Sequence, residues 1–171
     1  MSELTAFRKS KDEFFAKNED SPLTPQQRKQ FRSLEYYPEN DGFRFAVVLE
    51  EFPDQEKEPA EIITSTGEST TQIRWGKFSF MVDGQEVSLT VFRNVDGEEL
   101  FLPFADSTSG SETYGAGRYL EVVPMHDGRY LIDFNYAYNP YCAYNEDWSC
   151  PLTPFENRLQ VPIQAGEKKF K

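Results

Sequence analysis

The sequence is poor in histidine and cysteine, and this scarcity argues against several kinds of site. The single imidazole, His126, lies in a predicted turn away from the TSGSE string at Thr108–Glu112, so a Ser–His hydrolase is not expected. The two cysteines, Cys142 and Cys150, are too few for a disulfide-built scaffold and are not spaced as a CxxC zinc or redox motif. We therefore expect neither a metal nor a cofactor.

Positive charge and long apolar runs are also scarce. Lys and Arg number 18 against 29 Asp and Glu, a net charge of -11, which argues against nucleic-acid binding because phosphate contacts need clustered cations. No apolar stretch approaches the ~20 residues of a membrane span, and the opening MSELTAFRKSKDEFF has no apolar signal region. We expect a soluble, acidic, cytoplasmic protein without a nucleic-acid or membrane partner. The sequence does not define its oligomeric state.

Aromatic residues are what the sequence has in abundance. Its 15 Phe, 9 Tyr and 2 Trp can supply the bulk of a core, and their enrichment favours strands over helices. At 171 residues the chain is long enough to bury one core, so we predict a single domain over residues 1–171.

The first part of the chain carries helical signals instead. Apolar side chains recur at helical spacing over residues 4–15, after a serine suited to N-capping. Thr24 and Gln27 match a capping box, with a proline at the first helical position between them. Residues 1–37 therefore predict a short helical arm that covers one end or edge of a sheet or, alternatively, docks a partner.

From Phe43 the period of the pattern changes to two. Short apolar or alternating runs are separated by turn signals such as Asp83-Gly84 and His126-Asp127-Gly128. The predicted strands are residues 43–51, 61–66, 70–75, 77–82, 86–93, 99–104, 117–123, 129–134 and 158–163. About nine strands over residues 43–165, without helices between them, predict an all-β, mainly antiparallel fold. Short connections favour a meandering β-barrel over a sandwich.

Two long polar loops interrupt the strands, at residues 104–117 and 135–157. In an up-and-down meander alternate loops share an end, so these two should face each other across one barrel mouth, where ligand sites are common. We predict a small polar molecule as the partner at this mouth. The candidate contacts are Asp106, Thr108, Ser109, Glu112, Tyr114, Arg118, Asp133, Asn135, Tyr138, Asn139 and Tyr144.

Each charged candidate has a functional and a structural interpretation. Arg118 would clamp an anionic group, while Glu112 and Asp133 would accept hydrogen bonds or protons. Alternatively, Asp106 and the neighbouring hydroxyls form Asx and Ser/Thr turns, and Arg118 braces the loops. Asp133 and Asn135 share one face of their strand, and if Phe134 faces outward or into a second layer, that face is the barrel interior. Arg118 and the tyrosines would then be their natural partners.

The two cysteines of the second loop also have two interpretations. Cys142 and Cys150 are either buried free thiols, which a cytosolic address favours, or a disulfide that closes the loop.

The same loops carry a family resemblance. The strings PFADSTSGSETYGAGRY, DFNYAYNPYCAYN and CPLTPFEN resemble the bacterial and archaeal domain-of-unknown-function 1684 family, over Phe7 to about Gly166. That family has no established activity, so the resemblance implies a place for a site rather than a reaction. Two further functions stay open beside ligand binding. One is a histidine-independent acid–base enzyme using Glu112 or Asp133 with Arg118. The other is a protein-interaction domain using the arm and the acidic loop Asp54–Glu61.

Overall fold

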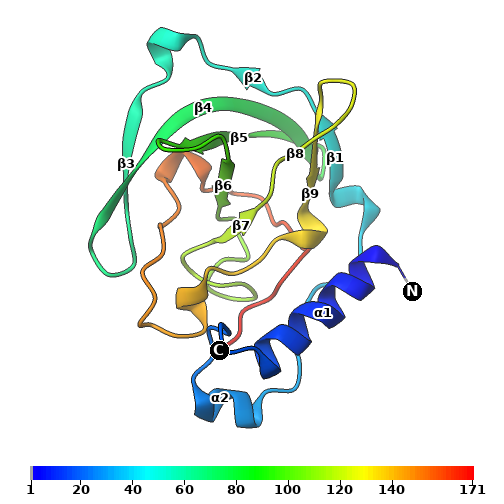
Figure 1. Ribbon diagram of the computed structural model, residues 1–171. Helices are drawn as coiled ribbons and strands as arrows, with labels where there is room; N and C mark the ends of the chain where they lie inside the picture. Colours follow the sequence, from blue (N-terminus) through cyan, green and yellow to red (C-terminus); the bar gives the residue numbers. More distant parts are fainter. Residues whose placement is uncertain (1) are drawn as a thin grey trace.

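The computed structural model in Figure 1 describes residues 2–171, in which two α-helices precede nine strands. The helices and strands are α1 (Glu3–Lys17), α2 (Pro25–Gln30), β1 (Arg44–Val47), β2 (Glu50–Glu51), β3 (Pro59–Ile63), β4 (Ser69–Val82), β5 (Gln85–Asn94), β6 (Leu100–Phe104), β7 (Arg118–Leu120), β8 (Val123–Pro124) and β9 (Tyr130–Asp133). Short 3-10 turns are η1 (Asp41–Phe43), η2 (Asp54–Glu56), η3 (Phe134–Tyr136), η4 (Tyr141–Ala143) and η5 (Phe155–Asn157). No helix among the described residues is both long and apolar enough to cross a bilayer.

The named strands pair antiparallel and form two sheets. One sheet has the order β1-β9-β8, and the other the order β2-β4-β5-β6-β7, with β3 also paired to β4. The prediction of a mainly antiparallel β fold with an N-terminal helical arm is confirmed. The strands of residues 2–171 do not close into one hydrogen-bonded barrel, because β1, β8 and β9 make their ladders only with one another.

The local signals of the sequence form the elements they predict. Ser2 caps α1 by accepting a hydrogen bond from the Thr5 amide at 3.1 Å. Thr24 and Gln27 make a reciprocal capping box at the start of α2. Asp83 and Gly84 both take positive φ, which a two-residue hairpin between β4 and β5 needs.

The predicted strands are wrong where long-range pairing sets the bounds of a strand. Residues 70–75 and 77–82 are one bent strand, β4, whose register shifts between Arg74 and Gly76. Residues 158–163 lie outside the named strands, and only Arg158 bridges, to Ala105. Because the strands are bounded and paired differently from the prediction, the alternate-loop argument that placed the two polar loops at one mouth does not hold.

The core lies between the two sheets and includes the C-terminal segment. This segment, red in Figure 1, runs from η5 through the interior of the molecule to the C terminus near α2. The buried core residues are Val47, Phe78, Phe80, Val82, Leu89, Val91, Leu102, Phe104, Leu120, Ile132, Phe134, Ala137, Val161, Ile163 and Ala165. Three of them come from residues 161–165, so an extended segment without a ladder fills the middle of the fold.

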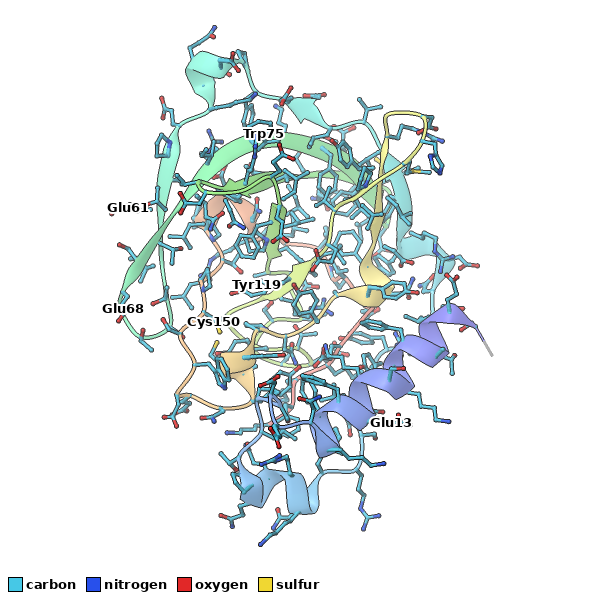
Figure 2. All side chains as sticks on the ribbon, viewed as in Figure 1. Glu13, Glu61, Glu68, Trp75, Tyr119 and Cys150 are labelled. Carbon is cyan, nitrogen blue, oxygen red and sulfur yellow. The ribbon has the colours of Figure 1, made fainter. Side chains whose placement is uncertain are left out.

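The helical arm packs on a smaller cluster of its own. Phe15 of α1 is buried with Leu23, Leu34 and Tyr144, and its ring meets that of Tyr144 edge-on at 4.9 Å between centroids. Glu13 projects from α1 into solvent, as Figure 2 shows. The arm is therefore an integral cover, since one face of α1 is buried against the body and the other is exposed.

Candidate functional site

Arg118, predicted as an anion clamp, is a buried brace for the C-terminal segment. Its guanidinium donates to the carbonyl oxygens of Ile163 at 2.9 Å, Ala165 at 2.5 Å and Glu167 at 3.1 Å. It also pairs with the Asp106 carboxylate at 3.3 Å. Burial lowers the pKa of Arg118, and the charge of Asp106 opposes this effect. The contacts of Arg118 do not include Glu112 or Asp133 among the described residues, so the predicted acid–base grouping is not assembled around it.

Asp106 and its neighbours form the tight polar loop of the structural interpretation. The Asp106 carboxylate accepts from the amide of Thr108 at 3.1 Å and from its hydroxyl at 2.6 Å. It also accepts from the amide of Ile163 at 2.6 Å. The Ser109 hydroxyl donates to the same carboxylate and accepts from the Asp106 amide. Asp106 and Arg118 together bind both the N–H and the C=O of Ile163, in place of a neighbouring strand.

The remaining candidates of the first loop point elsewhere. Glu112 is exposed and lies beside the C-terminal lysines, in a shallow hollow lined by Lys168, Lys169 and Lys171. Tyr114 is partly buried, and its hydroxyl lies 3.6 Å from the sulfur of Cys142 in the second loop. The two polar loops are therefore in contact at this point.

Asp133 faces the outside of its sheet, contrary to the prediction that it faces the interior with Arg118 as its partner. Its neighbours Ile132 and Phe134 are fully buried, so the alternation along β9 turns Asp133 outward. The carboxylate accepts from Arg44, its cross-strand neighbour, at 3.0 Å. It also accepts from the backbone and side-chain N–H groups of Asn135, at 3.0 and 2.8 Å.

Asn139 and Tyr144 belong to a buried carboxylate site that sequence reasoning missed. The acceptor is Glu167, a fully buried residue of the C-terminal segment that binds the hydroxyl of Tyr144. Lys11 of α1 reaches the same carboxylate at 2.8 Å, and the side-chain amide of Asn139 lies 3.4 Å away. The one sequence signal for this site was Lys11, which lies within the apolar stripe of α1. A cation at such a position needs a buried anion as its partner.

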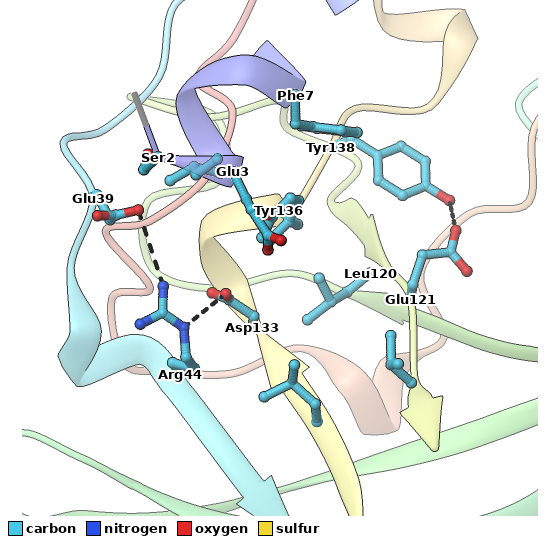
Figure 3. Close-up of a pocket in the computed structure, with 13 residues that line it drawn as sticks. Ser2, Glu3, Phe7, Glu39, Arg44, Leu120, Glu121, Asp133, Tyr136 and Tyr138 are labelled. Atoms are coloured by element: carbon cyan, nitrogen blue, oxygen red, sulfur yellow. Dashed lines mark hydrogen bonds and ion pairs between the residues drawn. The ribbon is translucent and has the colours of Figure 1, made fainter. Parts of the chain in front are cut away.

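A groove of about 620 Å³ lies on the outer face of the small sheet. Figure 3 shows the start of α1 above it, β9 along its floor and the end of β7 at its side. Its apolar and aromatic lining consists of Leu4, Phe7, Leu120, Val123, Leu131, Tyr136 and Tyr138. Leu131 and Val123 are cross-strand neighbours, so their side chains share one face of the sheet.

Carboxylates surround the groove from several elements. Its lining includes four carboxylates and one guanidinium: Glu3, Glu39, Glu121, Asp133 and Arg44. Arg44 is bound by Asp133 and lies 4.0 Å from Glu39, and the Tyr138 hydroxyl donates to Glu121 at 3.1 Å (Figure 3). Hydrogen bonds from Arg44 to Asp133 and Asp41 raise the pKa of this guanidinium, which keeps it charged. The groove therefore combines an apolar floor with a net negative surround.

The predicted site and the groove overlap at two residues only. Of the eleven candidates, Asp133 and Tyr138 line the groove. Sequence reasoning missed Phe7 of α1, Arg44 of β1 and Glu121 between β7 and β8, which meet only in the folded chain. Within residues 2–171 no cluster of three His, Cys, Asp or Glu side chains is placed to hold a metal ion.

Comparisons with known proteins identify relatives without assigning a function. The profile of the family described as "Protein of unknown function (DUF1684)" matches residues 29–168. A solution NMR structure of the uncharacterized protein from gene locus rrnAC0354 of Haloarcula marismortui is 34% identical, with a TM-score of 0.72. That match covers 96% of this chain and 91% of the other. A search of the curated proteins found no match.

Proposed function

Because this chain belongs to the DUF1684 family, whose description assigns no activity, we propose a function from its own geometry: it binds a small amphipathic organic cation. The observation that carries the proposal is the groove under α1, with an apolar floor and carboxylates around it. The sequence suggested a small polar ligand at the two long loops. The proposed site lies instead on the outer face of β9.

The size and lining of the groove support a small organic ligand. A volume of about 620 Å³ is typical of sites for small molecules, which are mostly apolar with a few placed polar groups. Leu120, Leu131 and Val123 offer apolar surface to the body of a ligand. Burying apolar atoms there contributes roughly 25 cal/mol per Å² removed from water.

The charges around the groove favour a cationic ligand. Its only cation, Arg44, is already engaged by carboxylates, whereas Glu121 and Glu3 make no ion pair in the described chain. The rings of Phe7 and Tyr136 lie 5.0 Å apart between centroids at the groove, and aromatic faces attract ammonium groups. An anionic ligand would meet repulsion from the same carboxylates.

Titration with three molecules of equal chain length tests the charge of the ligand. We expect n-octylamine to bind the ¹⁵N-labelled protein saturably and to shift the amide signals of Leu131, Val123 and Tyr138. Octanoate should not bind at this place, and 1-octanol should bind more weakly than the amine. Equal binding of all three would contradict the cation preference. Shifts confined to residues outside the groove would contradict the site.

Neutral variants of the groove carboxylates test their contribution. Because each is partly exposed, Glu39→Gln and Glu121→Gln should each weaken octylamine binding by about two- to fivefold. Calorimetry measures the dissociation constants. The matched control is Glu61→Gln on β3, at the opposite side of the molecule from α1 in Figure 2, which should leave binding unchanged. An equal loss in the control would point to a nonspecific effect of net charge.

A further inference from the structure

Cys142 and Cys150 form a close thiol pair that the proposed ligand site does not use. Both are free and nearly buried, with 6% and 8% of their surfaces exposed. The backbone amide of Cys142 donates to the sulfur of Cys150 at 3.3 Å, so the Cys150 sulfur is in contact with Cys142. Between them, residues 146–149 are exposed.

The surroundings of the pair distinguish the two sulfurs. A hydrogen bond from Cys150 and another from Tyr114 lower the pKa of Cys142 to about 6, although burial opposes them. The pKa of Cys150 is raised by its proximity to Cys142 and by burial. The other titratable groups facing the pair are Tyr119 and, through Tyr114, Glu146. These contacts favour the thiolate at Cys142 over Cys150, and thiolates are the nucleophiles.

The pair also sits where three loops meet. Tyr114 comes from the first polar loop, and both cysteines come from the second. In the turn after β3, the Ser65 hydroxyl accepts from the Cys150 amide at 3.2 Å and donates to the carbonyl of Trp148 at 3.1 Å. Residues 146–149 between the two cysteines are exposed, so local opening of this segment would give a small oxidant access to the sulfurs.

We propose that Cys142 and Cys150 are a reversible oxidation site that reacts with hydroperoxides and closes to a disulfide. The Cys142 thiolate attacks one oxygen of hydrogen peroxide, which breaks the O–O bond and gives a sulfenic acid and hydroxide. The Cys150 thiol then attacks the sulfenic sulfur and releases water. Overall, two thiols and one peroxide give one disulfide and two waters, and the two sulfurs supply both electrons. A dithiol reductant restores the pair by thiol–disulfide exchange.

Peroxide titration of the full-length reduced protein tests the reaction. Peptide mass mapping should show a Cys142–Cys150 crosslink, with a loss of about two mass units that dithiothreitol reverses. The rate should rise with pH around a midpoint near the Cys142 pKa of about 6. Failure to form this crosslink while circular dichroism shows the protein folded would overturn the proposal.

Two single variants separate the roles of the sulfurs. Cys150→Ser keeps a hydroxyl donor beside Cys142, so it should accumulate a sulfenic acid at Cys142 that dimedone traps. Cys142→Ser should consume peroxide at least tenfold more slowly than Cys150→Ser. Equal rates in the two variants would overturn the assignment of Cys142 as the nucleophile.

Tryptophan fluorescence gives an independent readout of loop closure. The ring of Trp148 lies edge-on to Tyr141 at 5.1 Å between centroids, within the segment that the disulfide would close. Oxidation should therefore change the emission of the wild-type protein and not that of Trp148→Phe, which retains Trp75. A change that persists in Trp148→Phe would mean that oxidation acts elsewhere.

Discussion

The Arg118 side chain makes backbone hydrogen bonds that a neighbouring β-strand would otherwise make. The segment at residues 158–163 alternates in burial like a strand, but it makes only one bridge. Arg118 and Asp106 bind the backbone of Ile163 from both sides, and Arg118 also binds Ala165. Because these groups are buried, each hydrogen bond also removes an unsatisfied backbone atom.

Removing Arg118 should therefore be costly. We expect Arg118→Met to lower the free energy of unfolding by about 3–5 kcal/mol, because it leaves the buried Asp106 carboxylate without its counter-charge and the carbonyls of Ile163, Ala165 and Glu167 without their guanidinium donor. Urea denaturation measures this value. The Asp106→Asn/Arg118→Met double variant should lose less than the sum of the single variants. The half-exposed pair Arg74–Glu156 is the control, and Arg74→Met should cost only about 0–1 kcal/mol. A similar loss in both arginine variants would contradict the role assigned to Arg118.

At the scale of the element, α1 is tied to the body by a charge as well as by its apolar face. Phe15 packs in the small cluster with Tyr144, and Lys11 reaches Glu167 in the C-terminal segment. The family profile starts only at residue 29, after α1. The contacts of Lys11 and Phe15 nevertheless make the helix part of the fold, and its first turns line the groove.

The stability of this attachment should depend on pH. Burial raises the pKa of Glu167 above its ordinary value of 4.5, while the Lys11 ammonium acts in the opposite direction. Glu167 therefore contributes most to the free energy of unfolding below pH 4.5, and this contribution falls as the pH rises through the pKa of Glu167 in the folded state. The free energy of unfolding of Glu167→Gln, relative to wild type, should rise over this range, by at most about 1.4 kcal/mol per pH unit.

Denaturation at a series of pH values measures this difference. Glu13→Gln, on the exposed face of α1, is the matched control. Its free energy of unfolding should change with pH in parallel with that of the wild type. A difference that stays constant from pH 4 to pH 8 would show that Glu167 does not govern the titration.

At the scale of the whole molecule, one aromatic core joins the two sheets. Phe134, just after β9, packs against Phe45 of β1, Phe80 of β4 and Phe104 of β6, with ring centroids 6.1, 5.3 and 5.2 Å away. No ladder connects the β1-β9-β8 sheet to the larger one in residues 2–171. Side-chain packing at these rings therefore joins the two sheets across the core, beside the backbone bridge between Tyr119 and Tyr138.

Truncating this ring should loosen the whole fold. We expect Phe134→Ala to cost about 3–5 kcal/mol of unfolding free energy, because it removes a fully buried ring and leaves a cavity. Thermal and urea unfolding measure the loss. The control, Phe155→Ala, changes a residue that is 90% exposed and should stay within about 0.5 kcal/mol of wild type. Comparable losses in the two variants would contradict a core centred on Phe134.

The sequence by itself determined the features that depend on neighbouring residues. The capping box at Thr24, the hairpin at Asp83-Gly84 and the change of period after Phe43 all involve contacts within a few positions. Local contacts can be inferred from residue types and spacing because the backbone geometry between them is nearly fixed. The antiparallel β class followed from the same signals.

Only the tertiary structure decided how these elements pair and which side chains face solvent. Residues 70–82 form one bent strand because β5 pairs with most of its length and β3 with its start, and a period-two pattern cannot identify a strand's partners. Arg118 is a brace because the chain beyond residue 160 returns to meet it. The groove exists because α1, β7 and β9 converge from distant parts of the sequence, and their relative positions depend on the packing of the whole core.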